Sequence, residues 1–474
     1  MFRRVLAIAL ACLVFSETIS GTNVFFVSPA GNDSNAGSIQ SPFLTLQKAF
    51  DVLSPGDTVF LRDGVYKAVG HQYANNFIKD KSGTAESPIV LMAYNDETPV
   101  IDGSDFPYSA TTDPSMAVIL MWNVSHVVVD GLVVRNGPRT GIHFVGQCED
   151  VIVRNCLVED CLGPGIGVGG FDAPYTLCKN VVVTQNTVVN CAQMFREAIS
   201  LRWVENFEIS HNRVENIVKE CIDAKSGCSN GKIFKNTITG GGDVGIYVDA
   251  GFSNTSILKN IKIYDNLIVN PHRVAIAIAS EEGNEGCDIY VFNNLIYDFY
   301  SGQGAGIKVA KNSASGNDGY IHDVYICNNT VYGRGQQGLY VNLGGVANIV
   351  FRNNISVNNA SQMALNTANG VNPDEVVIEN NLFCGAVSYI GLNAVVVEDV
   401  GVVFENAGAG DFHLRENSPA IDAGTSATAP ETDAEGRMRP FGDGYDIGCY
   451  EFVTASPLRS GLRARTLKNV RMKF

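Results

Sequence analysis

The chain has few of the residues that usually build metal or nucleic-acid sites. Its 474 residues include only 7 histidines and 2 tryptophans, and no two cysteines are spaced as CxxC, which argues against a structural zinc site of the common kind. Basic residues are also in the minority, with 34 Lys and Arg against 49 Asp and Glu and a net charge of −15. That balance argues against nucleic acid as a partner, but it permits an anionic sugar at a local basic patch.

Long apolar runs are missing except near the start of the chain. Arg3 and Arg4 precede an apolar run over residues 5–15, so residues 1–20 are predicted to be a secretory signal peptide. Such a run is too short to cross a bilayer, and no later run is longer, so we expect no membrane span and a secreted, extracellular protein. Six N-x-S/T sequons suit a glycoprotein: Asn32, Asn123, Asn254, Asn328, Asn354 and Asn359.

Cysteine use fits the same compartment. Of 12 cysteines, Cys12 falls in the predicted signal, and the odd remainder leaves at least one thiol free or paired elsewhere. An oxidising compartment favours disulfide bonds within the closest group, although their connectivity stays open: Cys148, Cys156, Cys161, Cys178 and Cys191.

What the chain has in quantity is glycine, at 48 residues, with Val, Ile and Asn prominent in its middle. These residues favour strands and turns. From about residue 117 an apolar strand, an asparagine turn and a short strand containing Gly-Ile recur. The turn asparagines follow one another at intervals of 24 to 35 residues, as in a solenoid: Asn155, Asn186, Asn212, Asn236, Asn266, Asn294, Asn329, Asn354 and Asn381.

This repeat predicts an all-β fold, a right-handed parallel β-helix in which each coil, or rung, packs on its neighbours. A β-sandwich would instead show hairpin turns and regular polar–apolar alternation. Asparagine tolerates the left-handed backbone of a sharp corner, and stacked asparagine side chains can form an internal hydrogen-bonded ladder.

The repeat also divides the chain. Residues 22–116 are expected to form an N-terminal cap and the first rungs, with a helix over Thr45–Leu53 closing the apolar end. The parallel β-helix is expected over 117–400 and a C-terminal β capping module over 401–455. The basic segment 456–474 is expected to be a disordered tail.

Several stretches resemble known proteins. The opening cap, the segment Ser87–Tyr94 (SPIVLMAY) and the asparagine rungs resemble secreted β-helix proteins of the pectate-lyase-like superfamily. The segments Ser418–Gly424 (SPAIDAG) and Asp446–Glu451 (DIGCYE) resemble the C-terminal module of bacterial surface β-helix proteins. The resemblance covers about residues 22–452 and implies a polysaccharide partner. It is less specific for activity, because that superfamily includes lyases, hydrolases, epimerases and adhesins.

Aligning the Gly-Ile strands predicts which side chains share a face, because stacked strands lie about 4.8 Å apart and alternate residues point outward. One interior row is expected: Ile199, Ile222, Ile246 and Ile276. Two outward columns are expected: Ser200, Asp223, Tyr247 and Ala277, and Arg202, Lys225, Asp249 and Ala279. In a third column Glu197 faces Glu220.

The acidic side chains of these columns form a candidate metal site. Two stacked glutamates repel each other unless a cation or a proton intervenes, so we expect a Ca²⁺ ion at Glu197, Glu220 and Asp223. The alternative is a salt-bridge ladder that only joins adjacent rungs. Arg202 lowers the pKa of Lys225 and Asp249 raises it, so the sequence leaves open whether this lysine is a usable base.

The segment Glu220–Ser226 is similar to the lysine rung of chondroitinase B-like and alginate lyases, which use a lysine base, an arginine and a calcium held by acidic residues. The resemblance implies that Lys225 removes the proton α to a uronate carboxylate and that Glu220 binds calcium. Those enzymes present an arginine on the next rung, where this chain has Asp249. We therefore expect Arg202, on the preceding rung, to bind the substrate carboxylate.

Two other functions stay open beside a monomeric lyase of an anionic polysaccharide. A glycoside hydrolase needs two carboxylates, about 5 Å apart when retaining and roughly 6.5–9.5 Å apart when inverting, and Asp223 with Asp249 suits either. A non-catalytic glycan-binding surface protein would stack Trp203 and Tyr247 on sugar rings, and Ser200 is a further candidate substrate contact.

Overall fold

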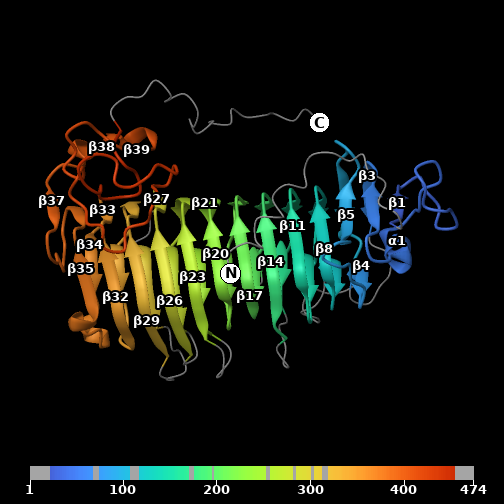
Figure 1. Cartoon of the computed structure of the whole chain (residues 1–474), viewed down its shortest axis with the longest axis horizontal. Helices are drawn as coiled ribbons and strands as arrows, with labels where there is room; N and C mark the ends of the chain where they lie inside the picture. Colours follow the sequence, from blue (N-terminus) through green and yellow to red (C-terminus); the bar gives the residue numbers. More distant parts are fainter. Residues whose placement is uncertain are drawn as a thin grey trace.

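The computed structural model describes residues 22–67, 74–106, 117–169, 176–194, 197–251, 257–280, 284–299, 304–311 and 319–453 (Figure 1). The predicted signal peptide and the predicted basic tail lie outside these residues. The described part is an elongated stack of strands that run in three long parallel sheets, so the predicted parallel β-helix is confirmed. No helix within it is long and apolar enough to cross a membrane.

The three sheets are named here sheets 1, 2 and 3, and on most rungs the chain visits sheet 1, then sheet 3, then sheet 2. Sheet 1 is formed by β1 (Val24–Val27), β2 (Thr58–Leu61), β5 (Ile89–Ala93), β8 (Ser125–Asp130), β11 (Glu149–Arg154), β14 (Cys178–Thr184), β17 (Val204–Ser210), β20 (Ser229–Phe234), β23 (Leu258–Tyr264), β26 (Glu285–Phe292), β29 (Tyr320–Cys327), β32 (Val346–Arg352) and β35 (Val376–Glu379). Sheet 2 is formed by β4 (Ala74–Lys79), β7 (Ala117–Trp122), β10 (Thr140–Val145), β13 (Ile166–Val168), β16 (Ile199–Arg202), β19 (Glu220–Lys225), β22 (Val244–Asp249), β25 (Val274–Ser280), β28 (Ala305–Lys311), β31 (Gln337–Val341) and β34 (Ser361–Leu365). Sheet 3 is formed by β3 (Gly64–Lys67), β6 (Pro99–Asp102), β9 (Val133–Arg135), β12 (Leu157–Glu159), β15 (Thr187–Val189), β18 (Arg213–Glu215), β21 (Thr237–Gly241), β24 (Leu267–Pro271), β27 (Leu295–Tyr297), β30 (Thr330–Tyr332), β33 (Ile355–Val357), β36 (Leu382–Cys384) and β37 (Val395–Val397).

The interior of the solenoid is one continuous apolar core. The predicted row is confirmed, because its four isoleucines are register partners on successive strands and are fully buried: Ile199, Ile222, Ile246 and Ile276. Burying one such side chain contributes about 1.5–3 kcal/mol, so a row repeated on every rung holds the stack together.

The asparagine ladder is confirmed for eight of the nine predicted positions. From Asn212 to Asn381, each side-chain Oδ1 accepts hydrogen bonds from the main-chain N–H and the Nδ2 of the ladder asparagine on the preceding rung, with Nδ2···Oδ1 distances of 2.9–3.0 Å. Asn155 is exposed and lies outside the ladder. Its neighbour Cys156 takes the ladder position and donates its N–H to Asn186 Oδ1 at 3.0 Å.

The sequence predicts that the ladder asparagine adopts the left-handed backbone at each corner. In the structure the residue before it does so. Positive φ angles of 51–58° occur at Asn155, Gln185, His211, Lys235, Asp265, Asn293, Asn328, Asn353 and Asn380. The ladder asparagine is thereby free to keep an ordinary backbone while its side chain points into the core. Only the sharp turn needs the left-handed conformation.

The two ends of the chain are closed differently. Helix α1 (Leu46–Val52) lies at the N-terminal end, within the predicted helical segment, and the Thr45 side chain caps it by accepting from the Lys48 N–H. Toward the other end there are four short 3₁₀ segments, two between β34 and β35 and two after β37: Thr367–Asn369, Pro373–Glu375, Val400–Val402 and Ala407–Ala409.

The C-terminal module contains the antiparallel pair β38 (Phe404–Asn406) and β39 (Asp411–Leu414). It packs over the outer side of the last strands of sheet 3, where Phe404 and Phe412 join Ile355 and Leu382 in a second apolar cluster (Figure 1). The predicted C-terminal β cap is therefore largely a lateral cover rather than a lid across the open end.

The doubled asparagines of the last rungs explain how this module attaches. The second asparagine of each pair belongs to the ladder, and the first points outward. Asn353 donates to Thr425 O at 2.8 Å, and Asn328 donates to Asp446 O at 3.0 Å. Within the module, the fully buried Arg439 and Glu451 form an ion pair.

Burial changes the expectation for three sequons. Asn328 and Asn354 are fully buried, and Asn359 is also buried, so these three amides are hydrogen-bonding groups of the fold and not accessible glycan acceptors. Asn32 is exposed, so glycosylation at this residue remains a prediction. Asn254 lies outside the described residues.

The eleven cysteines beyond residue 20 are free thiols in the structure, and all are buried. The Cys148 thiol, which donates a hydrogen bond to the Cys178 thiol on the adjacent rung, has a raised pKa because of this bond and its burial. Cys161 and Cys191 form a similar contact. The expected disulfide bonds remain predictions, and these contacts single out Cys148 with Cys178 and Cys161 with Cys191 as the pairs to test.

Candidate active site on the outer face of sheet 2

The two outward columns lie in the predicted register on strands β16, β19, β22 and β25. Ser200 pairs with Asp223, which pairs with Tyr247 and then Ala277. In the second column, Arg202 pairs with Lys225, which pairs with Asp249 and then Ala279. These side chains face away from the solenoid core yet are all buried. Charges placed there are poorly solvated, so their mutual interactions are stronger than on an open surface.

Glu197 is the centre of the cluster. Its carboxylate accepts a hydrogen bond from Ser200 Oγ at 3.2 Å and forms an ion pair with Lys225 Nζ. Arg202 Nη2 lies 3.7 Å from the same carboxylate. The residue comes just before β16, and its side chain turns toward the basic column and not only toward Glu220, the glutamate one rung on.

Lys225 is held by acidic groups on two rungs. Its Nζ lies 3.1 Å from Asp223 Oδ2 and 5.4 Å from the centre of the Tyr247 ring, in addition to its contact with Glu197. Burial opposes the charge, but Asp223 and Glu197 outweigh both burial and the repulsion of Arg202, and the pKa of Lys225 is raised. The question left open by the sequence is thus decided by carboxylates other than Asp249. Lys225 keeps its proton at neutral pH.

The pKa values of two acidic members of the cluster are also raised, which favours their neutral form. Burial, followed by repulsion from Glu197, raises the pKa of Asp223 to about 7. Burial and the same repulsion raise the pKa of Glu220. The raised pKa of Glu220 is the effect that repulsion between stacked glutamates should have, and the calcium site stays a prediction.

The donor set does not fit a calcium ion held by the protein alone. Calcium takes six to eight oxygen ligands. Of the three expected ligands, Glu197 and Asp223 already form ion pairs with Lys225, and only Glu220 lacks a cation within ion-pair distance among the described residues. Calcium binding at these residues remains a prediction.

The remaining predicted residues lie at the edge of this cluster. Trp203 follows β16 directly, has a positive φ of 50° and is buried. Asp249 is fully buried, and a Cβ atom at Gly251 would lie 2.5 Å from its Oδ2, so glycine at 251 leaves the room that this carboxylate needs.

One further lysine extends the first column. Lys308, on β28, is the register partner of Ala277, three rungs beyond Asp223. Burial and the charge of Arg273 lower the pKa of Lys308. In the sequence, Lys308 stands out only as a lysine whose column neighbours are small or uncharged. That pattern does not indicate that its pKa is lowered.

Comparisons with known proteins agree with this fold. Residues 25–196 match the family described as Pel9A-like, right handed beta helix region. Pectate lyase PEL9 of Emericella nidulans is 42% identical over 82 residues, which are 17% of this chain and only 19% of that protein. The uncharacterized protein YwoF of Bacillus subtilis is 25% identical over 351 residues, 66% of this chain and 69% of its own length.

Among solved structures, pectate lyase Pel9A superposes with a TM-score of 0.51 at 15% identity, covering 90% of this chain and 96% of that chain. At that identity the likeness concerns the fold alone. Residues 25–196 therefore carry the Pel9A-like region, and the described chain is a right-handed parallel β-helix with the pectate-lyase-like fold that its sequence resembles.

Proposed function

We propose that this protein is a secreted, monomeric polysaccharide lyase that cleaves an anionic, uronate-containing chain by β-elimination on the outer face of sheet 2. The observation that carries the proposal is the pair Arg202 and Lys225. Both are buried cations on adjacent strands of one column, and both lie against Glu197. Adjacent strands are about 4.8 Å apart, so the two side chains lie within the length of one uronate unit. The name pectate lyase, carried by the Emericella relative, supports the substrate class.

In the proposed reaction, Arg202 pairs with the substrate carboxylate through its planar guanidinium, which stabilises the charge that develops when the α proton leaves. Lys225 Nζ takes the C5 proton, the electron pair forms the C4–C5 double bond, and the bond from C4 to the glycosidic oxygen breaks. The departing oxygen takes up a proton from water and leaves as a hydroxyl group on its chain. Only the neutral amine can accept a proton, and the pKa of Lys225 is raised. Activity is therefore expected to increase about tenfold per pH unit until the lysine titrates in the alkaline range.

The first test is to incubate the protein with polygalacturonate, alginate and glycosaminoglycans and to record the ultraviolet absorbance of unsaturated products across neutral and alkaline pH. Lys225→Arg keeps the positive charge but cannot act as a base, so it should remove at least about 100-fold of activity. Lys308→Met is the matched lysine control and should leave turnover unchanged. If Lys308→Met abolishes activity and Lys225→Arg does not, the base assigned here is wrong.

A glycoside hydrolase is the second candidate, favoured by one observation. The pKa of Asp223 is raised to about 7, as is typical of a carboxylic acid that donates a proton at neutral pH. Asp249 would then be the second carboxylate. Release of reducing ends without ultraviolet absorbance, abolished by Asp223→Asn, would favour hydrolysis. Binding without either product would favour the non-catalytic alternative, in which Tyr247, Trp203 and Ser200 contact the sugar.

A further inference from the structure

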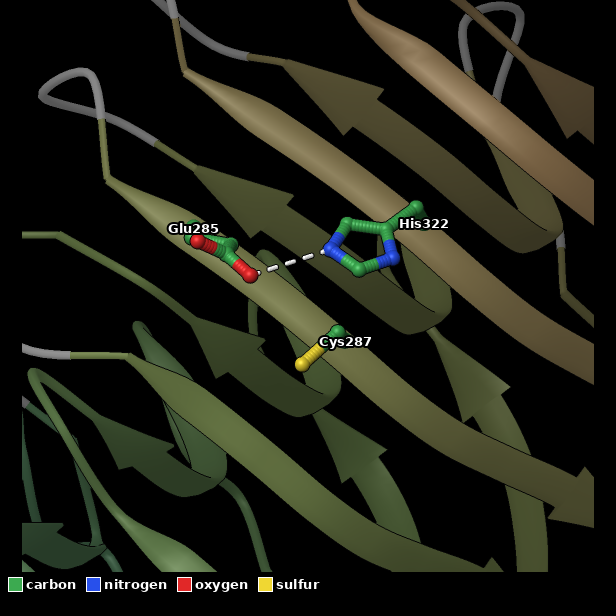
Figure 2. Close-up of side chains that lie close together, drawn as sticks. All are labelled: Glu285, Cys287 and His322. Atoms are coloured by element: carbon green, nitrogen blue, oxygen red, sulfur yellow. Dashed lines mark hydrogen bonds and ion pairs between the residues drawn. The ribbon is translucent and has the colours of Figure 1, made fainter.

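A second cluster of reactive side chains lies on sheet 1, outside the site described above. Glu285 and Cys287 project from β26, and His322 projects from the neighbouring strand β29 (Figure 2). Cys287 and His322 are direct register partners. One carboxylate oxygen, the thiol sulfur and a ring nitrogen of these residues all lie within 4.8 Å of one another.

The imidazole of His322 is held in a fixed orientation. Its Nδ1 lies 2.6 Å from Asp323 Oδ2, and Asp323 in turn accepts a hydrogen bond from Asn348 Nδ2 at 2.6 Å. The ring also stacks on Tyr320, with centroids 4.8 Å apart. These contacts direct Nε2 toward Glu285, whose Oε1 is 3.1 Å away (Figure 2). A carboxylate on the far nitrogen of a ligating histidine is the usual second contact at metal sites.

We propose that Glu285, Cys287 and His322 bind a divalent transition metal of the zinc class. A thiolate, an imidazole nitrogen and a carboxylate are the three donor types that zinc takes, whereas calcium and magnesium prefer oxygen alone. Three protein ligands leave a fourth tetrahedral position for water or another small ligand. The side chains of Glu285 and His322 are 43% and 22% exposed, so an ion can reach the site from solvent.

A second histidine of the chain shows what the thiol adds. His413 also lies between two carboxylates, with Nδ1 2.6 Å from Asp411 Oδ1 and Nε2 3.1 Å from Glu435 Oε1. Those distances equal the ones around His322. At His413, however, Arg437 forms an ion pair with Glu435. Among the described residues, the side chains around His413 do not form a group that could hold a metal ion. The two places thus form a matched pair, one with a thiol and one with a competing cation.

The test uses the whole protein under reducing conditions, titrated with Co²⁺ as a spectroscopic probe and then with Zn²⁺ in competition. We expect one equivalent of Co²⁺ to give a thiolate-to-metal charge-transfer band with tetrahedral ligand-field absorption. Cys287→Ser should remove the charge-transfer band, and His322→Ala should weaken binding by more than about 100-fold. Asp323→Asn should weaken it by about 10–100-fold. His413→Ala should leave the spectrum and the affinity unchanged.

Three results would overturn the proposal. They are a Co²⁺ spectrum with no thiolate band, a band that persists in Cys287→Ser, and binding by His322→Ala that equals that of the unaltered protein. Should Cys287→Ser fail to fold, the loss of the band in His322→Ala, compared with His413→Ala, decides the question. Because the metal titration requires no polysaccharide, its outcome is independent of the proposed lyase activity.

Discussion

The buried carboxyl of Asp223 should make the stability of the protein depend on pH. Its pKa is about 7 in the folded protein against an ordinary value of 3.8, because it is fully buried and lies near Glu197. The folded state therefore binds this proton more tightly than the unfolded state. The resulting stabilisation is complete below about pH 4 and is lost as the pH rises through 7. A difference of about three pH units corresponds to roughly 4 kcal/mol.

The assay is urea unfolding at several pH values from 4 to 8, comparing the unaltered protein with Asp223→Asn. The variant has no proton to lose at this position. As the pH rises from 4 to 8, its free energy of unfolding should therefore fall by several kcal/mol less than that of the unaltered protein. Asp265 and Asp446 also have raised pKa values, of about 6 and about 7, and leave a residual slope in both proteins. Asp374→Asn, at an exposed position, is the control and should behave as the unaltered protein. Equal slopes for Asp223→Asn and the unaltered protein would refute the assigned proton.

Three further predictions concern other parts of the molecule. Lys225→Met should lower the free energy of unfolding by about 3–5 kcal/mol at neutral pH, because it leaves Glu197 without its closest cation. Lys225→Arg should keep most of the stability, and an unchanged melting temperature in Lys225→Met would contradict these ion pairs. Asn236→Ala removes ladder hydrogen bonds to both adjacent rungs and should cost roughly 3 kcal/mol or more in chemical denaturation, so a loss below about 1 kcal/mol would contradict the ladder's contribution. Protein recovered from an oxidising compartment should contain a Cys148–Cys178 disulfide by non-reducing peptide mapping, and recovery of both residues as free thiols would exclude it.

The sequence alone determined the fold and the columns of the candidate site. A parallel β-helix repeats one register, so aligning the Gly-Ile strands is enough to predict that Ile199, Ile222 and Ile246 stack inward. The same alignment predicts that Arg202 and Lys225 stack outward. Backbone periodicity is a local property, and hydrophobic spacing records it directly.

Only the tertiary structure decided which charges meet and where the chain turns. Long side chains reach across columns, so Lys225 pairs with Glu197 and Asp223, and its pKa, whose direction the sequence left open, is raised. The left-handed residue at each corner precedes the ladder asparagine, a one-residue distinction that asparagine-rich turns conceal. Cys287 and His322 are 35 positions apart and meet because variable loops still return each strand to the same register. Loop length varies from rung to rung while the strand register is kept, so sequence spacing does not reveal such contacts, whereas the register of the folded sheets does.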